Sequence, residues 1–441
     1  MACEAIGTTV CHNHFTKFRQ TFGAYNQGNT QHMLDMDFQA YHLINILGEF
    51  DKTFSGICPN HFLPLKTACW HFEAAIGLND LPPSEEGFTW ATAALYLRDR
   101  GILRGDNTEA LELQQEYLFC LIGVLTCLYI PSPPENDSRY PYQIVVASPT
   151  THHRFWCFSN SHFANQWLTS PVRDQLSAIG DILPLTDKDG IASVDDGVVL
   201  DTAHFNANVM ISVLKMKIIW TDIIGSHLDY DVENNTVFLF RQPTLCFLHA
   251  VQAPEQKLSI LQRCVLDVGM DDEKLRGLMW EILLSIHVIF GQDPKSQHRL
   301  DEKVAFQGIP RKRRDVMLRR LCSEPWSFAD SCAYNYQSKR IYQLSAGDFP
   351  ILGPKLAYLS SEMARREPRS LWQLWKDQRN TLQWWTFWLV VIFGLISVIL
   401  TVVQTVLSGL QLHWAEVAAM QGQGSESSRA NLGSRHIQAL S

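Results

Sequence analysis

Four residues in the N-terminal third carry the kinds of side chain that bind zinc. Cys58 and His61 form a Cys-x-x-His pair, and Cys69 and His71 form a Cys-x-His pair further along the chain. A structural zinc ion takes four thiolate or imidazole donors in tetrahedral geometry, which the two pairs together could supply. The spacing matches no standard zinc finger, so buried thiols and satisfied core histidines are the alternative. These four residues are therefore candidate metal ligands, and the sequence predicts no cofactor.

Signatures of enzymes and nucleotide-binding proteins are absent from the sequence. It has no Gly-rich loop ending in Gly-Lys, no Gly-x-Ser-x-Gly, no His-Glu-x-x-His and no strand-linked Gly-x-Gly-x-x-Gly. Nucleophilic catalysis would need a cysteine beside a histidine and a third orienting group, and no pattern indicates such a convergence. A non-enzymatic protein is therefore expected. The alternative is an enzyme of unrecognised type that uses the Cys/His-rich region or residues 147–204.

Charge and cysteine content narrow the class of protein further. The formal net charge of −8 argues against general nucleic-acid binding. The eleven cysteines include no Cys-x-x-Cys pair, so buried thiols in a reducing compartment are expected. One basic cluster is present: Arg311, Lys312, Arg313, Arg314, Arg319 and Arg320. It could bind anionic lipid headgroups or act as a nuclear-import-like patch, and a solvated helix face is the simpler interpretation.

The longest apolar segment, residues 384–410, contains no charged residue. A helix rises about 1.5 Å per residue, so residues 387–407 would cover roughly 30 Å, the thickness of a bilayer's hydrocarbon core. Tryptophans at both ends would be anchors at the membrane interfaces. These anchors are Trp384, Trp385, Trp388 and Trp414. The sequence therefore predicts one C-terminal transmembrane helix.

Basic residues are distributed unequally around this segment. Five precede it closely: Arg365, Arg366, Arg369, Lys376 and Arg379. Only Arg429 follows it within about twenty residues. Because basic flanks stay in the cytosol, the long N-terminal region is expected there and the C-terminus in the lumen or outside. The first residues show no signal-peptide pattern, which agrees with this orientation, and the sequons at Asn136 and Asn234 would stay unused.

Small residues recur at every fourth position within the apolar segment, at Ser397, Thr401, Thr405 and Gly409. Such a row lets two helices approach closely, so it predicts a homodimer through this face. The alternative is that the hydroxyl groups bond to carbonyls of their own helix, which requires no partner.

Local patterns divide the chain into six parts. The predicted parts are a helical Cys/His-rich region at 1–130, a Pro-rich linker at 131–141, a mixed α+β region at 142–345 with a hairpin at 227–241, a helical stalk at 346–383, the transmembrane helix at 384–410 and a disordered tail at 411–441. Apolar residues spaced by three and four indicate the helices, and Asn234-Asn235 between two strand-like runs indicates the hairpin. The predicted fold class is predominantly α with a small β-hairpin element (α+β), plus one C-terminal transmembrane helix.

Two blocks carry a family resemblance. Residues 200–246 contain Thr-Ala-His-Phe-Asn-Ala-Asn at 202–208 and Trp-Thr-Asp at 220–222, and residues 371–411 contain Leu-Trp-Lys-Asp at 374–377 and Trp-Trp-Thr-Phe-Trp at 384–388. Both blocks resemble a group of uncharacterised membrane-anchored proteins of filamentous fungi. The resemblance implies a fungal source, one C-terminal span and a strain-specific accessory role in hyphal growth form or surface. It implies no activity, cofactor or catalytic residue.

These observations favour one function class. We expect a single-pass membrane protein whose cytosolic region is a non-enzymatic scaffold or interaction module. Its expected partners are the lipid bilayer, a protein of unknown identity and a second copy of the chain, and nucleic acid is not expected. A membrane-tethered enzyme with a Cys/His metal site is the alternative.

Overall fold

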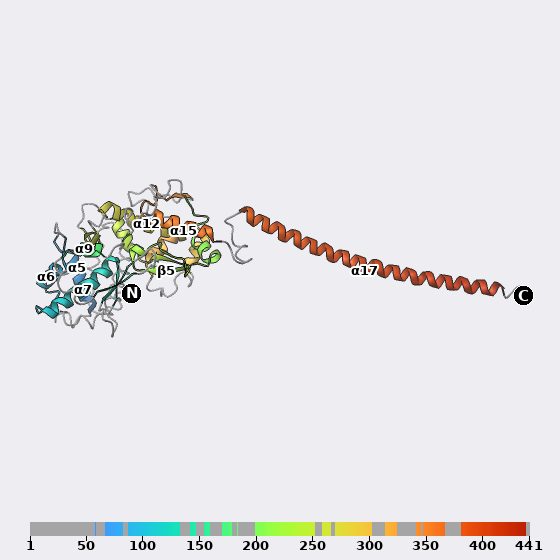
Figure 1. Ribbon diagram of the computed structural model, residues 1–441, viewed down its shortest axis with the longest axis horizontal. Coiled ribbons are helices and arrows are strands. Elements are labelled where there is room, and N and C mark those ends of the chain that lie inside the picture. The colour runs from blue at the N-terminus through green and yellow to red at the C-terminus, as the bar shows by residue number, and fades with distance from the viewer. Residues whose placement is uncertain are drawn as a thin grey trace. The chain divides into compact units, whose positions relative to one another are not determined.

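The computed structural model separates the chain into two compact units, Met1–Pro368 and Arg369–Ser441, which we call the body and the C-terminal unit. The described residues are 58, 67–82, 87–132, 142–146, 154–158, 170–178, 183, 199–251, 258–265, 270–301, 314–323, 341–344, 347–366 and 381–437. The predominantly α fold class with small β elements is confirmed (Figure 1).

Three helices come first among the described elements of the body. They are α5 (Thr67–Asn79), α6 (Trp90–Asp99) and α7 (Thr108–Thr126). The hydroxyl of Thr89 accepts the backbone N–H of Thr92 and caps α6, and the side chain of Asn107 caps α7 in the same way. The apolar half of α7, residues 117–124, is buried. Figure 1 shows these helices together on one side of the body, away from α12 and α15.

Two small antiparallel sheets lie in the body. The first has the order β1-β2-β3, with β1 (Ile130–Ser132), β2 (Tyr142–Val146) and β3 (Arg154–Phe158). The second pairs β4 (Val199–Asp201) with β8 (Ile341–Gln343). The predicted linker at 131–141 therefore begins inside a strand, and residues 133–141 lie outside the described part of the chain.

The predicted hairpin is confirmed as part of a third sheet, with the order β5-β7-β6. Its strands are β6 (Tyr230–Asp231) and β7 (Thr236–Phe240), which pair antiparallel, and β5 (Lys217–Thr221), which pairs parallel to β7. A short helix, η4 (Ile224–Ser226), connects β5 to the hairpin. Asn235 has a φ of 53°, a value that asparagine tolerates in tight turns. All residues of β7 are buried because it is the central strand.

The remaining body elements are mainly helices. They are α9 (Val172–Ala178), the π-helical turn η3 (Val209–Val213), α10 (Pro243–Ala250), α11 (Ile260–Val265), α12 (Asp272–Phe290), α13 (Pro294–Asp301), α14 (Val316–Ser323) and α15 (Gly353–Arg365). Asp271 caps α12 through the backbone N–H of Lys274. After its first turns α12 is buried on all sides, so it is the central helix of this half of the body. Buried apolar residues from Cys58 to Met363 form one connected core.

The structure corrects the predicted stalk at 346–383. Helix α15 packs Leu356, Leu359 and Met363 into the body core and ends at Arg365, because Arg366 has an extended backbone. The predicted stalk is therefore not one unbroken helix, and Pro368 agrees with this end, because a proline is common one or two residues after a C-cap, where it cannot continue the helix. Gly353 begins α15, where an added Cβ would overlap the carbonyl oxygen of Leu344.

The C-terminal unit contains one long helix, α17 (Thr381–Ile437). Its residues Trp384–Met420 are long and apolar enough to cross a membrane, with a mean hydropathy of 2.7 in the most apolar window and none of that window buried. The structure differs from the predicted disordered tail, because the helix continues past Leu410 to Ile437. Residues 415–420, Ala-Glu-Val-Ala-Ala-Met, are mostly strong helix formers, which explains the continuation to Met420, and helix propensity does not explain the helix over residues 421–437, which contain three glycines and four serines.

A buried carboxylate joins α12 to the beginning of α15. The side chain of Glu281 accepts the backbone N–H of Ile351 at 3.0 Å and that of Leu352 at 2.6 Å. Burial raises the pKa of Glu281 to about 8, although the two backbone donors act in the opposite direction. The folded body therefore favours a protonated Glu281 at neutral pH.

This proton predicts a pH-dependent stability. The ordinary glutamate pKa is about 4.3, so from about pH 4.3 to about pH 8 the unfolded chain has lost this proton while the folded chain retains it. The free energy of unfolding should therefore fall as pH rises, by about 2 kcal/mol between about pH 6.5 and about pH 8. Denaturation of the full-length protein in detergent, followed by tryptophan fluorescence, measures it. Glu281→Gln should remove this part of the slope, and an unchanged slope would contradict the assignment. His227 does not interfere, because its pKa is lowered to about 3 and its contribution is lost only at more acidic pH.

Candidate functional site

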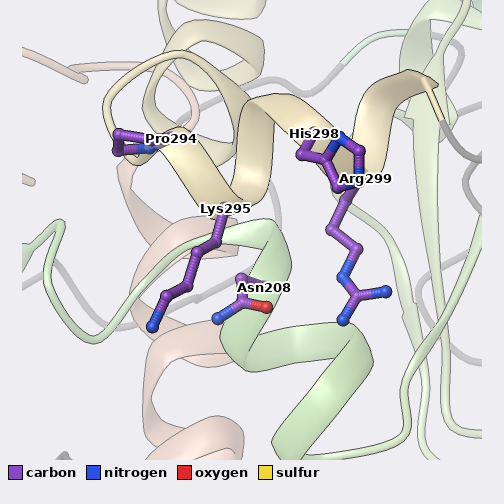
Figure 2. Close-up of a pocket in the computed structure, with 5 residues that line it drawn as sticks. All are labelled: Asn208, Pro294, Lys295, His298 and Arg299. Carbon is purple, nitrogen blue, oxygen red and sulfur yellow. The ribbon is translucent and has the colours of Figure 1, made fainter.

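A hollow on the body surface collects basic and amide side chains from two elements. Its volume is about 380 Å³, and its lining residues are Asn208, Pro294, Lys295, His298 and Arg299. Asn208 directly precedes η3, and the other four belong to α13 (Figure 2). We call it the Lys295 pocket.

A network of asparagine and serine side chains fixes the segment that carries Asn208. The amide of Asn206 donates to the carbonyls of Thr202 and Ala203 at 3.0 and 3.1 Å, and its oxygen accepts the N–H of Val209 at 3.0 Å. The hydroxyl of Ser296 accepts the backbone N–H of Asn208 at 2.9 Å, which ties this segment to α13. The hydrogen bonds of Asn206 and Asn208 therefore give these two residues of the Thr-Ala-His-Phe-Asn-Ala-Asn block a structural role.

The turn η3 places the next side chains of the pocket. The N–H of Leu214 bonds to the carbonyl of Val209 at 3.1 Å, a five-residue spacing that defines a π turn and is frequent at functional sites. Ser212 lies one turn after Asn208, and its hydroxyl donates to Asn208 Oδ1 at 3.0 Å. Arg299 Nη2 donates to the same hydroxyl at 2.8 Å. A chain of hydrogen bonds thus runs from Arg299 through Ser212 to Asn208.

These hydrogen bonds determine which side-chain atoms of Asn208 face the pocket. Because Oδ1 accepts from Ser212, the amide nitrogen points the other way, toward the ammonium group of Lys295, as Figure 2 shows. The pocket therefore presents an ammonium and an amide N–H₂ on one side and a guanidinium on the other. The nearby carboxylate of Asp293 accepts both the N–H and the hydroxyl of Ser296 at 2.9 Å and caps α13.

A second polar cluster lies deeper, between η4, β6 and α15. Lys355 Nζ donates to the carbonyls of Gly225 and His227 at 2.6 and 3.1 Å and to Asp229 Oδ1 at 2.7 Å. His227 Nδ1 accepts the N–H of Phe240 at 3.0 Å, which leaves Nε2 to donate to Ser285 Oγ at 2.7 Å. Burial, and then the charge of Lys355, lower the pKa of His227 to about 3, so the ring is neutral. The cluster holds secondary-structure elements together and does not open into the pocket described above.

The predicted metal ligands are only partly covered by the structure. Cys58 and His71 are buried, and His71 Nδ1 shares a hydrogen bond of 3.0 Å with the hydroxyl of Tyr117. His61 and the side chain of Cys69 lie outside the described residues. Within the described part, no three His, Cys, Asp or Glu side chains are grouped to hold a metal ion. The four-residue zinc site stays a prediction, and His71 is a core histidine with one ring nitrogen in a hydrogen bond.

Six cysteines whose side chains the structure describes are buried, as the sequence predicts: Cys58, Cys120, Cys127, Cys246, Cys264 and Cys322. Burial raises the pKa of Cys264 to about 12 and that of Cys120 well above its ordinary value. Such thiols stay protonated at neutral pH and are poor nucleophiles. Of the predicted basic cluster, residues 311–313 and the side chains of Arg319 and Arg320 are outside the described part, so a lipid-binding role for it stays a prediction.

The residues singled out in the apolar segment all lie on α17. Thr401 and Thr405 each donate a hydroxyl to the carbonyl four residues earlier, at 2.8 Å. This is the arrangement that needs no partner. Gly409 has nothing within 4 Å of an added Cβ, and Ser397 lies on the same row. A homodimer through this row stays a prediction. Trp384, Trp385 and Trp388 lie near the beginning of α17, and Trp414 lies beyond the uncharged segment.

Sequence reasoning missed the pocket residues on α13. Lys295, His298 and Arg299 have the i, i+3, i+4 spacing that places side chains on one helix face, and this was the available signal. No sequence pattern relates these residues to Asn208, which is about ninety positions away from α13. Comparison of the chain with protein-family models, curated proteins and solved structures finds no match in any of the three.

Proposed function

We propose that the protein is a single-pass membrane protein whose body is cytosolic and holds a protein partner at the membrane, with no chemistry of its own. One observation carries the proposal, the helix α17. Its residues Trp384–Met420 are long and apolar enough to cross a membrane, and none of the most apolar window is buried in the structure. An exposed surface of this hydropathy would be unstable in water, and a bilayer is the environment in which it is favourable.

The flanks of α17 support the proposed orientation. The interfacial tryptophans Trp384, Trp385 and Trp388 lie on the side of the basic residues, and Trp414 lies on the other side. Basic residues near a span favour the cytosol, so the body is placed there. The resemblance of residues 200–246 and 371–411 to membrane-anchored fungal proteins supports the same proposal, with an accessory role in hyphal growth form or surface.

We expect a protein carrying a tag at each end to resist carbonate extraction from intact microsomes. Added protease should remove the N-terminal tag, and the C-terminal tag should stay protected. Asn234 gives an independent measure, because it is exposed in the turn between β6 and β7 and is the acceptor of a sequon. A cytosolic body predicts no glycan at Asn234 or Asn136, with the N234Q variant as the reference for gel mobility.

Two outcomes would contradict the proposal. Extraction of the protein by carbonate would show that α17 does not cross the bilayer. A protected, glycosylated body would invert the orientation and place the cysteines in an oxidising compartment.

A further inference from the structure

We propose that the Lys295 pocket binds a phosphomonoester, that is, a phosphate group carried on a lipid headgroup or on a soluble molecule. The proposal goes beyond membrane anchoring and concerns a site on the body. It rests on three observations. The pocket is lined by hydrogen-bond donors, two of these donors are fixed by hydrogen bonds to Ser212, and Lys295 Nζ and Asn208 Nδ2 have no hydrogen-bond partner among the described residues.

The lining groups are hydrogen-bond donors with positive charge. Lys295 and Arg299 are cationic side chains, and Asn208 directs its amide N–H₂ group toward Lys295 (Figure 2). Phosphate oxygens accept such bonds and are bound by lysine as a point charge and by arginine through its planar guanidinium. A neutral or cationic ligand would not match this set of groups.

Two donors are available without breaking an existing contact. Among the described residues, neither Lys295 Nζ nor Asn208 Nδ2 has a hydrogen-bond or ion-pair partner, and Lys295 is exposed. The nearby acid Asp293 is already the cap of α13. An anion could therefore enter the pocket and replace only water.

Two of the three donors, Asn208 and Arg299, are also held in place before a ligand binds. Ser212 fixes the amide orientation of Asn208 and accepts from Arg299, and Ser296 fixes the backbone of Asn208. Pre-organised groups lose little entropy on binding, which favours a specific site over a loose basic surface. The volume of about 380 Å³ accommodates a phosphate together with a small attached group.

The test uses the full-length protein in phosphatidylcholine nanodiscs, titrated with inorganic phosphate and with glycerophosphate by calorimetry. Lys295→Gln should weaken binding about tenfold, the usual loss for one charge-assisted hydrogen bond. Lys217→Gln is the matched control, since Lys217 is an exposed lysine on β5 outside the pocket, and it should leave the affinity unchanged. Lys295→Arg should retain most of the affinity.

Asn208→Asp gives a second variant with an unchanged shape. The new carboxylate can still accept from Ser212, but it replaces the amide donors by negative charge, so phosphate binding should fall by more than tenfold. No phosphate binding by the natural protein, or equal affinities for K295Q and K217Q, would overturn the proposal. A thermal melt like that of the natural protein excludes misfolding as the cause of lost binding.

A further arm distinguishes the two sources of phosphate. The titration is repeated in nanodiscs that contain phosphatidic acid, whose headgroup is a phosphomonoester, or phosphatidylserine, which has a phosphodiester. If phosphatidic acid alone weakens the binding of soluble phosphate, the ligand is a lipid headgroup. If neither lipid competes, the ligand is a soluble phosphomonoester.

Discussion

Replacing both Leu395 and Leu400 by arginine should move the full-length protein from the carbonate-resistant membrane fraction into the soluble fraction. Both leucines lie within α17 and are exposed along it, so no part of the structure would shield the new charges. One arginine at the centre of a bilayer costs about 2.5 to 3.5 kcal/mol, so the pair costs about 5 to 7 kcal/mol. This loss should prevent stable insertion, and fractionation followed by immunoblotting measures it.

The control introduces the same number of arginines into the body. Leu95 on α6 and Ile219 on β5 are exposed apolar side chains, so arginine can replace both without burial of charge. The L95R/I219R variant should stay membrane-bound. If the L395R/L400R variant also resists carbonate, α17 is not the anchor and the proposed function fails.

Replacing Lys355 by methionine should cost about 3 to 5 kcal/mol of stability, because it leaves a buried carboxylate without its counter-charge. The side chain of Asp229 is only 9% exposed, and Lys355 Nζ is the cation that lies 2.7 Å from it. The same substitution also removes the donor for the carbonyls of Gly225 and His227. The free energy of unfolding of the full-length protein in detergent measures this loss.

Two further variants separate lost charge pairing from lost packing. Adding Asp229→Asn to Lys355→Met removes the unpaired charge, so the double variant should be more stable than Lys355→Met alone. Arg100→Met breaks an ion pair with Asp80 in which the arginine and aspartate side chains are 44% and 38% exposed, and it should cost at most about 1 kcal/mol. Equal losses in the K355M and R100M variants would show that burial does not determine the strength of these pairs.

The parts of the fold that depend on neighbouring residues could be predicted from the sequence. An apolar segment without charge predicts a long apolar helix, and the Asn234-Asn235 turn between two strand-like runs predicts the hairpin of β6 and β7. The position at which the long helix ends could not be predicted from neighbouring residues. The residues directly after Leu410, up to Met420, favour continuation by their helix propensities, whereas the glycines and serines of residues 421–437 suggest disorder and are nevertheless helical.

Contacts between distant residues could not be predicted. The Lys295 pocket requires Asn208 to meet α13, which is about ninety residues away in the chain, through a bond to Ser296. Lys355 and Asp229 are 126 positions apart, and Glu281 meets Leu352 across 71 positions. A periodic pattern shows which face of an element is buried and does not show which element covers it. For the same reason the sequence did not show that β5 pairs parallel to β7.

If α17 crosses a bilayer as proposed, the positions of its tryptophans set the bilayer thickness that it fits without tilting. Trp384 and Trp414 are separated by about thirty residues, which is roughly 45 Å of helix and equals the thickness of a bilayer with its headgroups. Both rings can then reach their interfaces when the helix stands upright in a thick, sterol-rich plasma membrane. The hydrocarbon core of the endoplasmic reticulum is about 5 Å thinner, so there the helix must tilt or draw the lipids outward. Under the proposed anchoring, this mismatch would make a thick membrane the better fit for α17.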